Sequence, residues 1–284
     1  MRVLVTGGCG YIGRYVVSEL LRIGHHVTVA QRRLEGVPAG AEGVSFDIFA
    51  LDRGSFDRLG RPEVCVNLAW EDGFDHNSAK HLDNVGGHVR FIRFLVEAGI
   101  KQIVGVGSVH EVGFYEGMVN ERTATNPAHA YAIAKNFLRQ VQKLLCNQRG
   151  IVSQWARCHY VVGDDRRTNS VFKKLLEAED QGKLAFDFNS GEMLRDFIDV
   201  GSLGRQIAIV ASQTAVAGTI DCCSGKPVSL RSRVTSFIAD HQLKIVPMWG
   251  NLPARPYDSS AIWGDPSRFA EAARALGPLS SVAV

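Results

Sequence analysis

The sequence has no stretch that would place it in a membrane or on a nucleic acid. No apolar run reaches the roughly 18 to 20 residues that a bilayer-spanning helix needs. The chain passes from Met1 and Arg2 directly into VLVTGG, without a leader. Its 32 lysines and arginines are spread along the chain instead of forming a basic run, and its formal net charge is only +3. We therefore expect a cytoplasmic protein that contacts neither membrane nor nucleic acid.

The sequence also lacks the cysteine and histidine spacings of a metal site. Its six cysteines include no CxxC pair, and its nine histidines form no HExxH or HxxxH pair on a helix. We predict small, buried cysteines instead of a disulfide framework, and no metal. Internal repeats and low-complexity tracts are absent too.

What is present is an alternation of apolar β-branched runs with amphipathic segments through the first 160 residues. This alternation predicts an α/β fold of the Rossmann type, a doubly wound parallel sheet covered by helices on both faces. Gly24, Gly99 and Gly150 stand just after the helical segments, where a stop signal is expected. The predicted strands are 2–6, 26–30, 43–47, 63–68, 102–107 and 152–157, and the predicted helices are 11–23, 79–98 and 129–149.

The pattern loosens after residue 160 into shorter elements separated by turns such as NSGE and CSGKP. We predict a Rossmann domain over 1–160, to which elements near 196–222 return, and a smaller C-terminal lobe that takes most of 161–284. Open α/β sheets bind ligands at the carboxyl ends of their strands. A cleft between the two lobes is therefore the expected site of chemistry.

The first predicted strand runs into the segment TGGCGYIG, residues 6 to 13. Gly7, Gly10 and Gly13 have the GxxGxxG spacing, and Tyr11 and Ile12 lie inside the same turn. Glycines allow a tight turn, a close approach of the backbone to a pyrophosphate, and helix N–H groups that face its charge. The position between a strand and a helix makes this a strong prediction of dinucleotide binding.

The end of the second strand bears on which dinucleotide is bound. NAD sites usually offer Asp or Glu there to the adenosine ribose. This strand ends in Gln31, Arg32 and Arg33, and no carboxylate follows until Glu35. Arginine pairs with a 2′-phosphate, whereas a carboxylate repels it. The residues therefore favour NADP(H) over NAD(H).

Three side chains have the chemistry of a carbonyl reductase. Tyr131 and Lys135 lie one helical turn apart in HAYAIAK, and Ser108 follows a strand that ends at the same edge of the sheet. An ammonium beside a phenol stabilises its ionised form, so that tyrosine can act as an acid–base near neutral pH. Ser108 can hydrogen-bond a substrate carbonyl while Tyr131 gives a proton to its oxygen.

With these motifs the sequence resembles an extended short-chain dehydrogenase/reductase, the family of NAD(P)-dependent nucleotide-sugar epimerases, dehydratases and ketoreductases. The resemblance covers nearly the whole chain, and the motifs occur in the order of the family. They are TGGCGYIG (6–13), VNLAW (66–70), DNVGGHVRFIRFLVEAGIKQIV (83–104), NPAHAYAIAK (126–135), RCHYVVG (157–163), RDFIDV (195–200), GTIDCCSGKPVSL (218–230) and RPYDSSAIWGDPSRF (255–269).

The resemblance implies a set of cofactor contacts. Asp47 and Ile48 would lie at the adenine, Leu68 and Ala69 along the cofactor, and Lys135 on the nicotinamide ribose. It also implies a homodimer built through the helices near 79–98 and 129–149.

The resemblance further implies a nucleotide-diphosphate sugar as substrate. Arg195 and Arg255 match positions where the nucleotide-sugar enzymes of the family bind the diphosphate, and Asp258 would take a ribose hydroxyl. Tyr160 replaces an asparagine that often contacts substrate. His110 and His159 are further candidates for the wall of the sugar pocket, with structural roles as the alternative.

The sequence departs from the 4,6-dehydratases of the family, which follow the active-site hydroxyl residue with Asp-Glu. Here Ser108 is followed by Val109 and His110, so dehydration is disfavoured. The leading hypothesis is an NADPH-dependent ketoreductase acting on a nucleotide-linked 4-keto-6-deoxy sugar. The alternatives are a nucleotide-sugar epimerase that keeps its cofactor bound and, more remotely, a non-catalytic NADP-binding regulatory protein.

Overall fold

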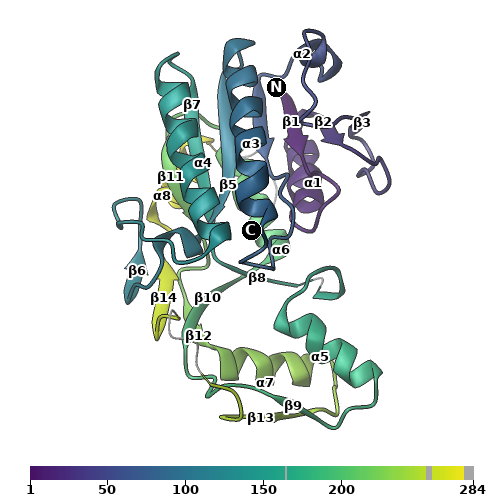
Figure 1. The fold of residues 1–284 in the computed structure, drawn as a ribbon, viewed down its shortest axis with the longest axis vertical. Helices are drawn as coiled ribbons and strands as arrows, with labels where there is room; N and C mark the ends of the chain where they lie inside the picture. The colour runs from purple at the N-terminus through teal and green to yellow at the C-terminus, as the bar shows by residue number, and fades with distance from the viewer. Residues whose placement is uncertain (164, 254–257, 278–284) are drawn as a thin grey trace.

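The fold is built around a seven-stranded sheet in which every neighbouring pair of strands is parallel (Figure 1). The computed structural model describes residues 1–163, 165–253 and 258–277. The strand order is β11-β7-β5-β4-β1-β2-β3. In chain order these strands are β1 Arg2–Thr6, β2 His26–Gln31, β3 Glu42–Ser45, β4 Val64–Asn67, β5 Gln102–Ser108, β7 Val152–Cys158 and β11 Gly218–Cys222.

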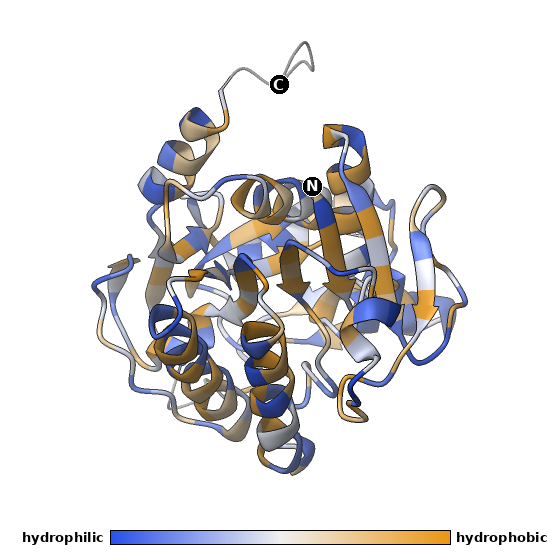
Figure 2. Ribbon diagram, turned by 90° about the horizontal axis from the view of Figure 1, so that it is seen from above, coloured by the Kyte–Doolittle hydropathy of each residue, from blue (hydrophilic) through white to orange (hydrophobic). Residues whose placement is uncertain are grey.

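Helices cover both faces of this sheet, as the buried side chains of β1 demonstrate. Val3 and Val5 belong to one apolar cluster, together with residues of α1 (Gly13–Ile23) and α6 (Val200–Ala211). Leu4, between them, packs on the opposite face with residues of α3 (Lys80–Glu97) and α4 (Ala130–Asn147). Figure 2 shows mainly hydrophobic strands at the centre and helices of mixed hydropathy around them. The alternation follows from the two-residue period of a strand.

The strand order reverses at β1, which pairs with β2 on one side and β4 on the other. Thr6 at the end of β1 stands opposite Ala30 of β2 and Asn67 of β4. This reversal is the place where doubly wound sheets open a crevice at the carboxyl ends of their strands.

A smaller part of the chain lies beyond those ends (Figure 1). The four-strand path β12-β10-β14-β6, extended by β8 on β10, and the pair β13-β9 form its sheets. Phe172, Leu175, Val234 and Phe237 bury a separate apolar core between α5 and α7. The bounds are β6 Gly117–Val119, β8 Tyr160–Val162, α5 Val171–Asp180, β9 Ala185–Asp187, β10 Leu194–Asp199, β12 Pro227–Ser229, α7 Leu230–Asp240, β13 Val246–Met248, β14 Ala261–Gly264 and α8 Ser267–Ala275.

The structure confirms the Rossmann-type parallel sheet predicted from the sequence. All six predicted strands and all three predicted helices are present, with bounds that differ by one or two residues. The chain returns to the main sheet through α6 and β11. Short elements were not predicted from the sequence; they include α2 Ser55–Arg58 and the 3-10 turns Val109–Val112 and Asp165–Arg167.

Candidate active site

A cleft of about 1480 Å³ opens at the carboxyl ends of the parallel strands and continues into the smaller lobe. Arg255 lies outside the described residues. Every other predicted site residue lines this cleft: Gly7, Gly10, Tyr11, Ile12, Gly13, Arg32, Arg33, Asp47, Ile48, Leu68, Ala69, Ser108, His110, Tyr131, Lys135, Tyr160, Arg195 and Asp258.

The glycine turn is closely packed, which explains the glycines at positions 7 and 13. Gly7 has a φ of +70°, and a β-carbon there would lie 2.9 Å from the backbone nitrogen of Ala69. A β-carbon on Gly13 would overlap the carbonyl oxygen of Gly7. The turn therefore brings bare backbone to the cleft ahead of the N-terminus of α1, which is the arrangement that fits a dinucleotide pyrophosphate.

Tyr11 connects the glycine turn to the smaller lobe. Its hydroxyl donates a hydrogen bond of 2.6 Å to the carbonyl oxygen of Gly163, just after β8. Burial raises the pKa of Tyr11 above its ordinary value, which keeps the hydroxyl protonated as a donor. One side of the cleft is thus closed by a contact between residues 152 positions apart.

The end of β2 differs from what an NADP site requires. Arg32 is paired with a carboxylate, because its Nη2 lies 2.5 Å from Oε1 of Glu71. The Gln31 side chain is engaged as well, since its Oε1 accepts a hydrogen bond from the backbone N–H of Cys9. From the sequence alone, Arg32 is expected to be available for a 2′-phosphate. The structure gives it an acidic partner, so the pattern of residues no longer supports a preference for NADP.

Two further strand ends supply the remaining predicted cofactor contacts. Asp47 accepts a hydrogen bond from the backbone N–H of Phe49, and Ile48 is buried beside it. Leu68 and Ala69 follow β4, where the N–H of Ala69 donates to the Thr6 hydroxyl across the switch point. The contact between Ala69 and Thr6 fixes the backbone after β4 beside Gly7 of the glycine turn.

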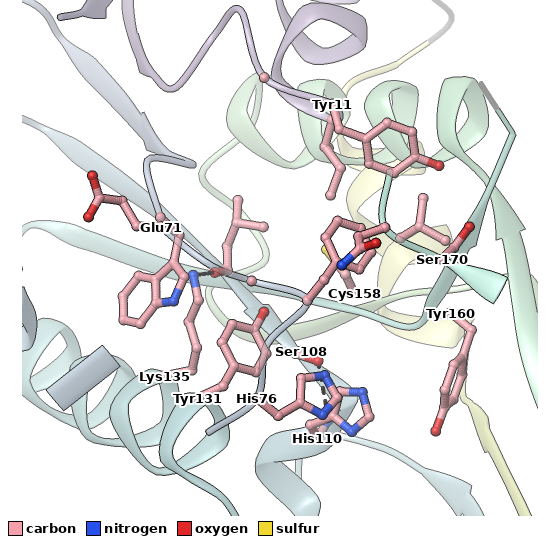
Figure 3. A pocket seen from close by; sticks show the side chains of 18 of the residues that line it. Tyr11, Glu71, His76, Ser108, His110, Tyr131, Lys135, Cys158, Tyr160 and Ser170 are labelled. Atoms are coloured by element: carbon pink, nitrogen blue, oxygen red, sulfur yellow. Dashed lines mark hydrogen bonds between the residues drawn. The ribbon is translucent and has the colours of Figure 1, made fainter. Parts of the chain in front are cut away.

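Ser108, Tyr131 and Lys135 lie together across the cleft from Tyr11 of the glycine turn (Figure 3). Ser108 ends β5 and caps the 3-10 turn after it. Tyr131 and Lys135 come from the first turns of α4, which begins after His129, whose Nδ1 accepts a hydrogen bond from the N–H of Ala132. Nζ of Lys135 donates to the carbonyl oxygen of Val106 at 2.8 Å.

The electrostatics of Tyr131 differ from the prediction. Burial raises the pKa of its hydroxyl above the ordinary value, and a hydrogen bond with Ser108 opposes the rise only in part. Burial also lowers the pKa of Lys135 to about 8, and the Glu111 carboxylate opposes that shift. The Lys135 ammonium stands 5.9 Å from the centre of the Tyr131 ring. The predicted lowering of the Tyr131 pKa is therefore outweighed by burial in the structure.

An aromatic wall that was not foreseen from the sequence surrounds Tyr131. Lys135 Nζ lies 4.0 Å from the centre of the Trp70 ring, a cation–π contact. The His76 ring stacks on that of Tyr131, with centroids 5.7 Å apart, and lies 4.6 Å from the ring of His110 (Figure 3). Trp70 and His76 sit in an irregular segment before α3, so no helical or strand period pointed to them.

Glu111, the nearest carboxylate after Ser108, turns away from the cleft. It is fully buried and accepts hydrogen bonds from the backbone N–H of Ser108 at 2.8 Å and from the Trp155 indole at 2.9 Å. An ion pair with Arg139 completes its surroundings. A carboxylate held in this way stabilises the turn after β5 and is not offered to a substrate, in agreement with the absence of the dehydratase Asp-Glu pair.

The far end of the cleft carries the predicted substrate residues. Arg195 is buried, its Nη1 donates to the carbonyl oxygen of Leu194, and its guanidinium lies 5.4 Å from the centre of the Tyr160 ring. The Tyr160 ring lies 5.7 Å from that of His110. Burial holds the pKa of His110 well below its ordinary value, so its imidazole is neutral near neutral pH and Arg195 is the cation of this wall.

Within the described residues, no helix has both the length and the apolarity to cross a bilayer. Over the same ranges, no group of three or more His, Cys, Asp or Glu side chains is arranged to hold a metal ion.

Comparison with known proteins identifies relatives of this chain. A family model described as "NAD dependent epimerase/dehydratase family" matches residues 3–220. The curated protein "dTDP-6-deoxy-L-talose 4-dehydrogenase (NAD(+))" of Aggregatibacter actinomycetemcomitans is 44% identical over 271 residues, which are 93% of this chain and 99% of that protein. A "GDP-6-deoxy-D-talose 4-dehydrogenase" of the same organism is 24% identical, over 95% of this chain and 90% of its own.

Solved structures share the fold at lower sequence identity. "MoeE5 in complex with UDP-glucose and NAD" has a TM-score of 0.80 at 22% identity, and the match covers 95% of this chain and 91% of that one. The UDP-glucose 4-epimerase of Thermus thermophilus, in complex with NAD, has a TM-score of 0.79 at 20% identity, with 95% and 92% covered.

Proposed function

The chain belongs to the NAD dependent epimerase/dehydratase family, and from this premise we propose that it transfers hydride between a nicotinamide and C4 of a nucleotide-linked 6-deoxy sugar. One observation carries the proposal: Ser108, Tyr131 and Lys135 line the same cleft as the glycine turn. The name of the relative with 44% identity supports the position of the reacting carbon. Oxidation of a 4-hydroxyl and reduction of a 4-ketone are the two directions of one reaction, so the ketoreductase predicted from the sequence and a 4-dehydrogenase share one mechanism.

Tyr131 is the proposed acid–base. In the direction of reduction its hydroxyl gives a proton to the C4 oxygen of the sugar, while Ser108 hydrogen-bonds the same oxygen. In oxidation Tyr131 takes that proton back. When bound, the nicotinamide supplies or accepts the hydride. Lys135 stabilises the phenolate that forms after proton donation, because its ammonium lies on the same helix one turn away.

NAD(H) is the proposed cofactor, in place of the NADP(H) predicted from the residues. The pairing of Arg32 with Glu71 supports this proposal. The name of the relative with 44% identity, which includes NAD(+), supports it independently.

The proposed substrate is a nucleoside-diphosphate sugar, with a dTDP sugar as the first choice because of the same relative. The buried Arg195 would bind the diphosphate, since a planar guanidinium forms paired hydrogen bonds with such an anion. Asp258 lines the cleft nearby and is the proposed acceptor for a ribose hydroxyl. Arg255 keeps its predicted role as a second diphosphate contact.

The test is turnover with a panel of dTDP-, CDP-, GDP- and UDP-linked 4-keto-6-deoxy sugars and added NADH or NADPH. We expect oxidation of NADH with the dTDP sugar. Turnover that needs no added reductant, together with NAD that stays bound through purification, would favour an epimerase. If neither NADH nor NADPH is oxidised with any of the sugars, the proposal is contradicted.

We also expect a homodimer built through α3 and α4. Supporting it, Leu82 of α3 and the α4 residues Ile133, Phe137 and Leu144 are large apolar side chains exposed on the surface. The three residues of α4 follow helical spacing and lie on one face. Light scattering should give twice the mass of one chain, and the double substitution Phe137→Glu with Leu144→Glu should give a monomer. A wild-type monomer at micromolar concentration would contradict the dimer.

A further inference from the structure

We propose that Glu71 is the residue that selects NAD(H) over NADP(H), by neutralising Arg32 and by offering its carboxylate to the adenosine ribose. The inference rests on the proposed dinucleotide-binding function, but it does not depend on the identity of the sugar. Both residues line the cleft.

The pair joins two strand ends that are far apart in the sequence. Arg32 follows β2 and Glu71 stands shortly after β4, while β1, which ends in the glycine turn, lies between these two strands. The ion pair therefore bridges the switch point, beside the turn that fits the pyrophosphate. The adenosine ribose is attached to that pyrophosphate, so it must lie within reach of this bridge.

The Glu71 carboxylate is fixed by a second contact. Oε1 binds Nη2 of Arg32, and Oε2 accepts a hydrogen bond of 3.1 Å from the Asn84 amide of α3. The Glu71 side chain is 35% exposed and that of Arg32 is 66% exposed. The bridge is thus open to solvent and to a ligand, while Asn84 keeps the carboxylate at the cleft wall.

The two cofactors differ only in the group on the adenosine 2′-oxygen, and the bridge acts on that difference. A 2′-phosphate carries close to two negative charges at neutral pH, and it would have to displace Glu71 from Arg32 while facing the released carboxylate. A 2′-hydroxyl is neutral and can donate a hydrogen bond to a carboxylate. Glu71 thereby supplies, from the fourth strand, the acidic group that the second strand lacks.

Two other charged residues near the end of β2, Glu35 and Arg33, have to be distinguished from the Glu71–Arg32 pair. Glu35, the first carboxylate after β2 in the sequence, is exposed and is not among the residues that line the cleft. Arg33 lines the cleft beside Arg32 and is the second cation that a 2′-phosphate could reach. The test therefore has to separate the two arginines.

The experiment measures the dissociation constants of NADH and NADPH by fluorescence titration at fixed ionic strength, without any sugar. The variants are Glu71→Gln, Arg32→Ala and the double variant. Glu63→Gln is the matched control, because it removes one carboxylate from an ion pair with Lys101 that does not line the cleft. Failure to turn over a sugar would leave these constants measurable, so the two proposals fail separately.

We expect Glu71→Gln to tighten NADPH about tenfold or more relative to NADH, since a charge-assisted hydrogen bond to phosphate becomes available. In the double variant, the Arg32→Ala substitution should abolish this gain. Glu63→Gln should leave the ratio of the NADPH and NADH dissociation constants unchanged. An unchanged ratio in Glu71→Gln would overturn the proposal. So would an equal shift in Glu63→Gln, or a gain that survives Arg32→Ala and thus belongs to Arg33.

Discussion

Replacing Tyr131 with phenylalanine is expected to lower kcat by about 10²- to 10⁴-fold, because the variant keeps the ring but loses the proton donor. The dissociation constant of NADH should change by less than about twofold, since the hydroxyl contributes to chemistry and not to cofactor binding. Steady-state kinetics and fluorescence titration measure the two quantities separately.

Tyr115→Phe is the matched control for that substitution. Tyr115 packs in a small apolar cluster and, unlike Tyr160 of the same cluster, does not line the cleft, so its variant should keep wild-type kcat. A Tyr131→Phe enzyme with kcat within about threefold of wild type would remove Tyr131 from the chemistry. A parallel loss of NADH binding would instead indicate a structural role.

Replacing Lys135 with methionine is expected to lower kcat by about 10²-fold or more, because the phenolate of Tyr131 loses its ammonium neighbour. The same substitution should change how stability depends on pH. Lys135 is buried, and its pKa falls from an ordinary value of 10.5 to about 8 on folding.

The sign of the pH effect follows from proton binding. Between pH 8 and 10.5 the unfolded chain holds a proton on Lys135 that the folded chain has released, so stability rises with pH through this window. Below pH 8 both states are protonated, and the folded state bears the full cost of the buried charge. The difference in free energy of unfolding between wild type and Lys135→Met should therefore grow in favour of wild type as the pH rises.

Denaturant titrations across this pH window measure that difference, with Lys101→Met as control because the Lys101 side chain is 74% exposed. The Lys101 variant should keep the rise of stability with pH that Lys135 gives the wild type. A wild-type curve parallel to that of Lys135→Met would mean that Lys135 titrates in the folded protein as it does in the unfolded chain.

The parallel sheet was predictable because its signal is local and strong. Buried strands read as short apolar runs, and the helices between them end near Gly24, Gly99 and Gly150, all of which have positive φ. The individual strands and helices of the smaller lobe were not predicted, because strands of three residues such as β8 and β9 are too short to show the two-residue hydrophobic period of a strand. Their pairing depends on contacts distant in sequence.

The sequence predicted which side chains line the cleft but not how their charges are paired. Motif positions identified the residues that line the cleft, including Ser108, Tyr131 and Lys135. The partner of Arg32 could not be read from the sequence, since Glu71 is 39 residues away and the two meet only when β2 and β4 flank β1. The pKa of Tyr131 could not be read either, because burial is set by elements that pack around the cleft.

Transfer of deuterium tests the central claim most directly. The protein is incubated with a dTDP-4-keto-6-deoxy sugar and each of the two NADH forms that carry deuterium on one face of nicotinamide C4, and the sugar is analysed by NMR. If Tyr131 protonates the oxygen as hydride reaches carbon, one of the two forms, and not the other, should place deuterium at C4 of the sugar. Tyr131→Phe should slow that transfer by the same factor by which it lowers kcat. A sugar reduced without deuterium from either form, or label delivered equally well by Tyr131→Phe, would contradict the account.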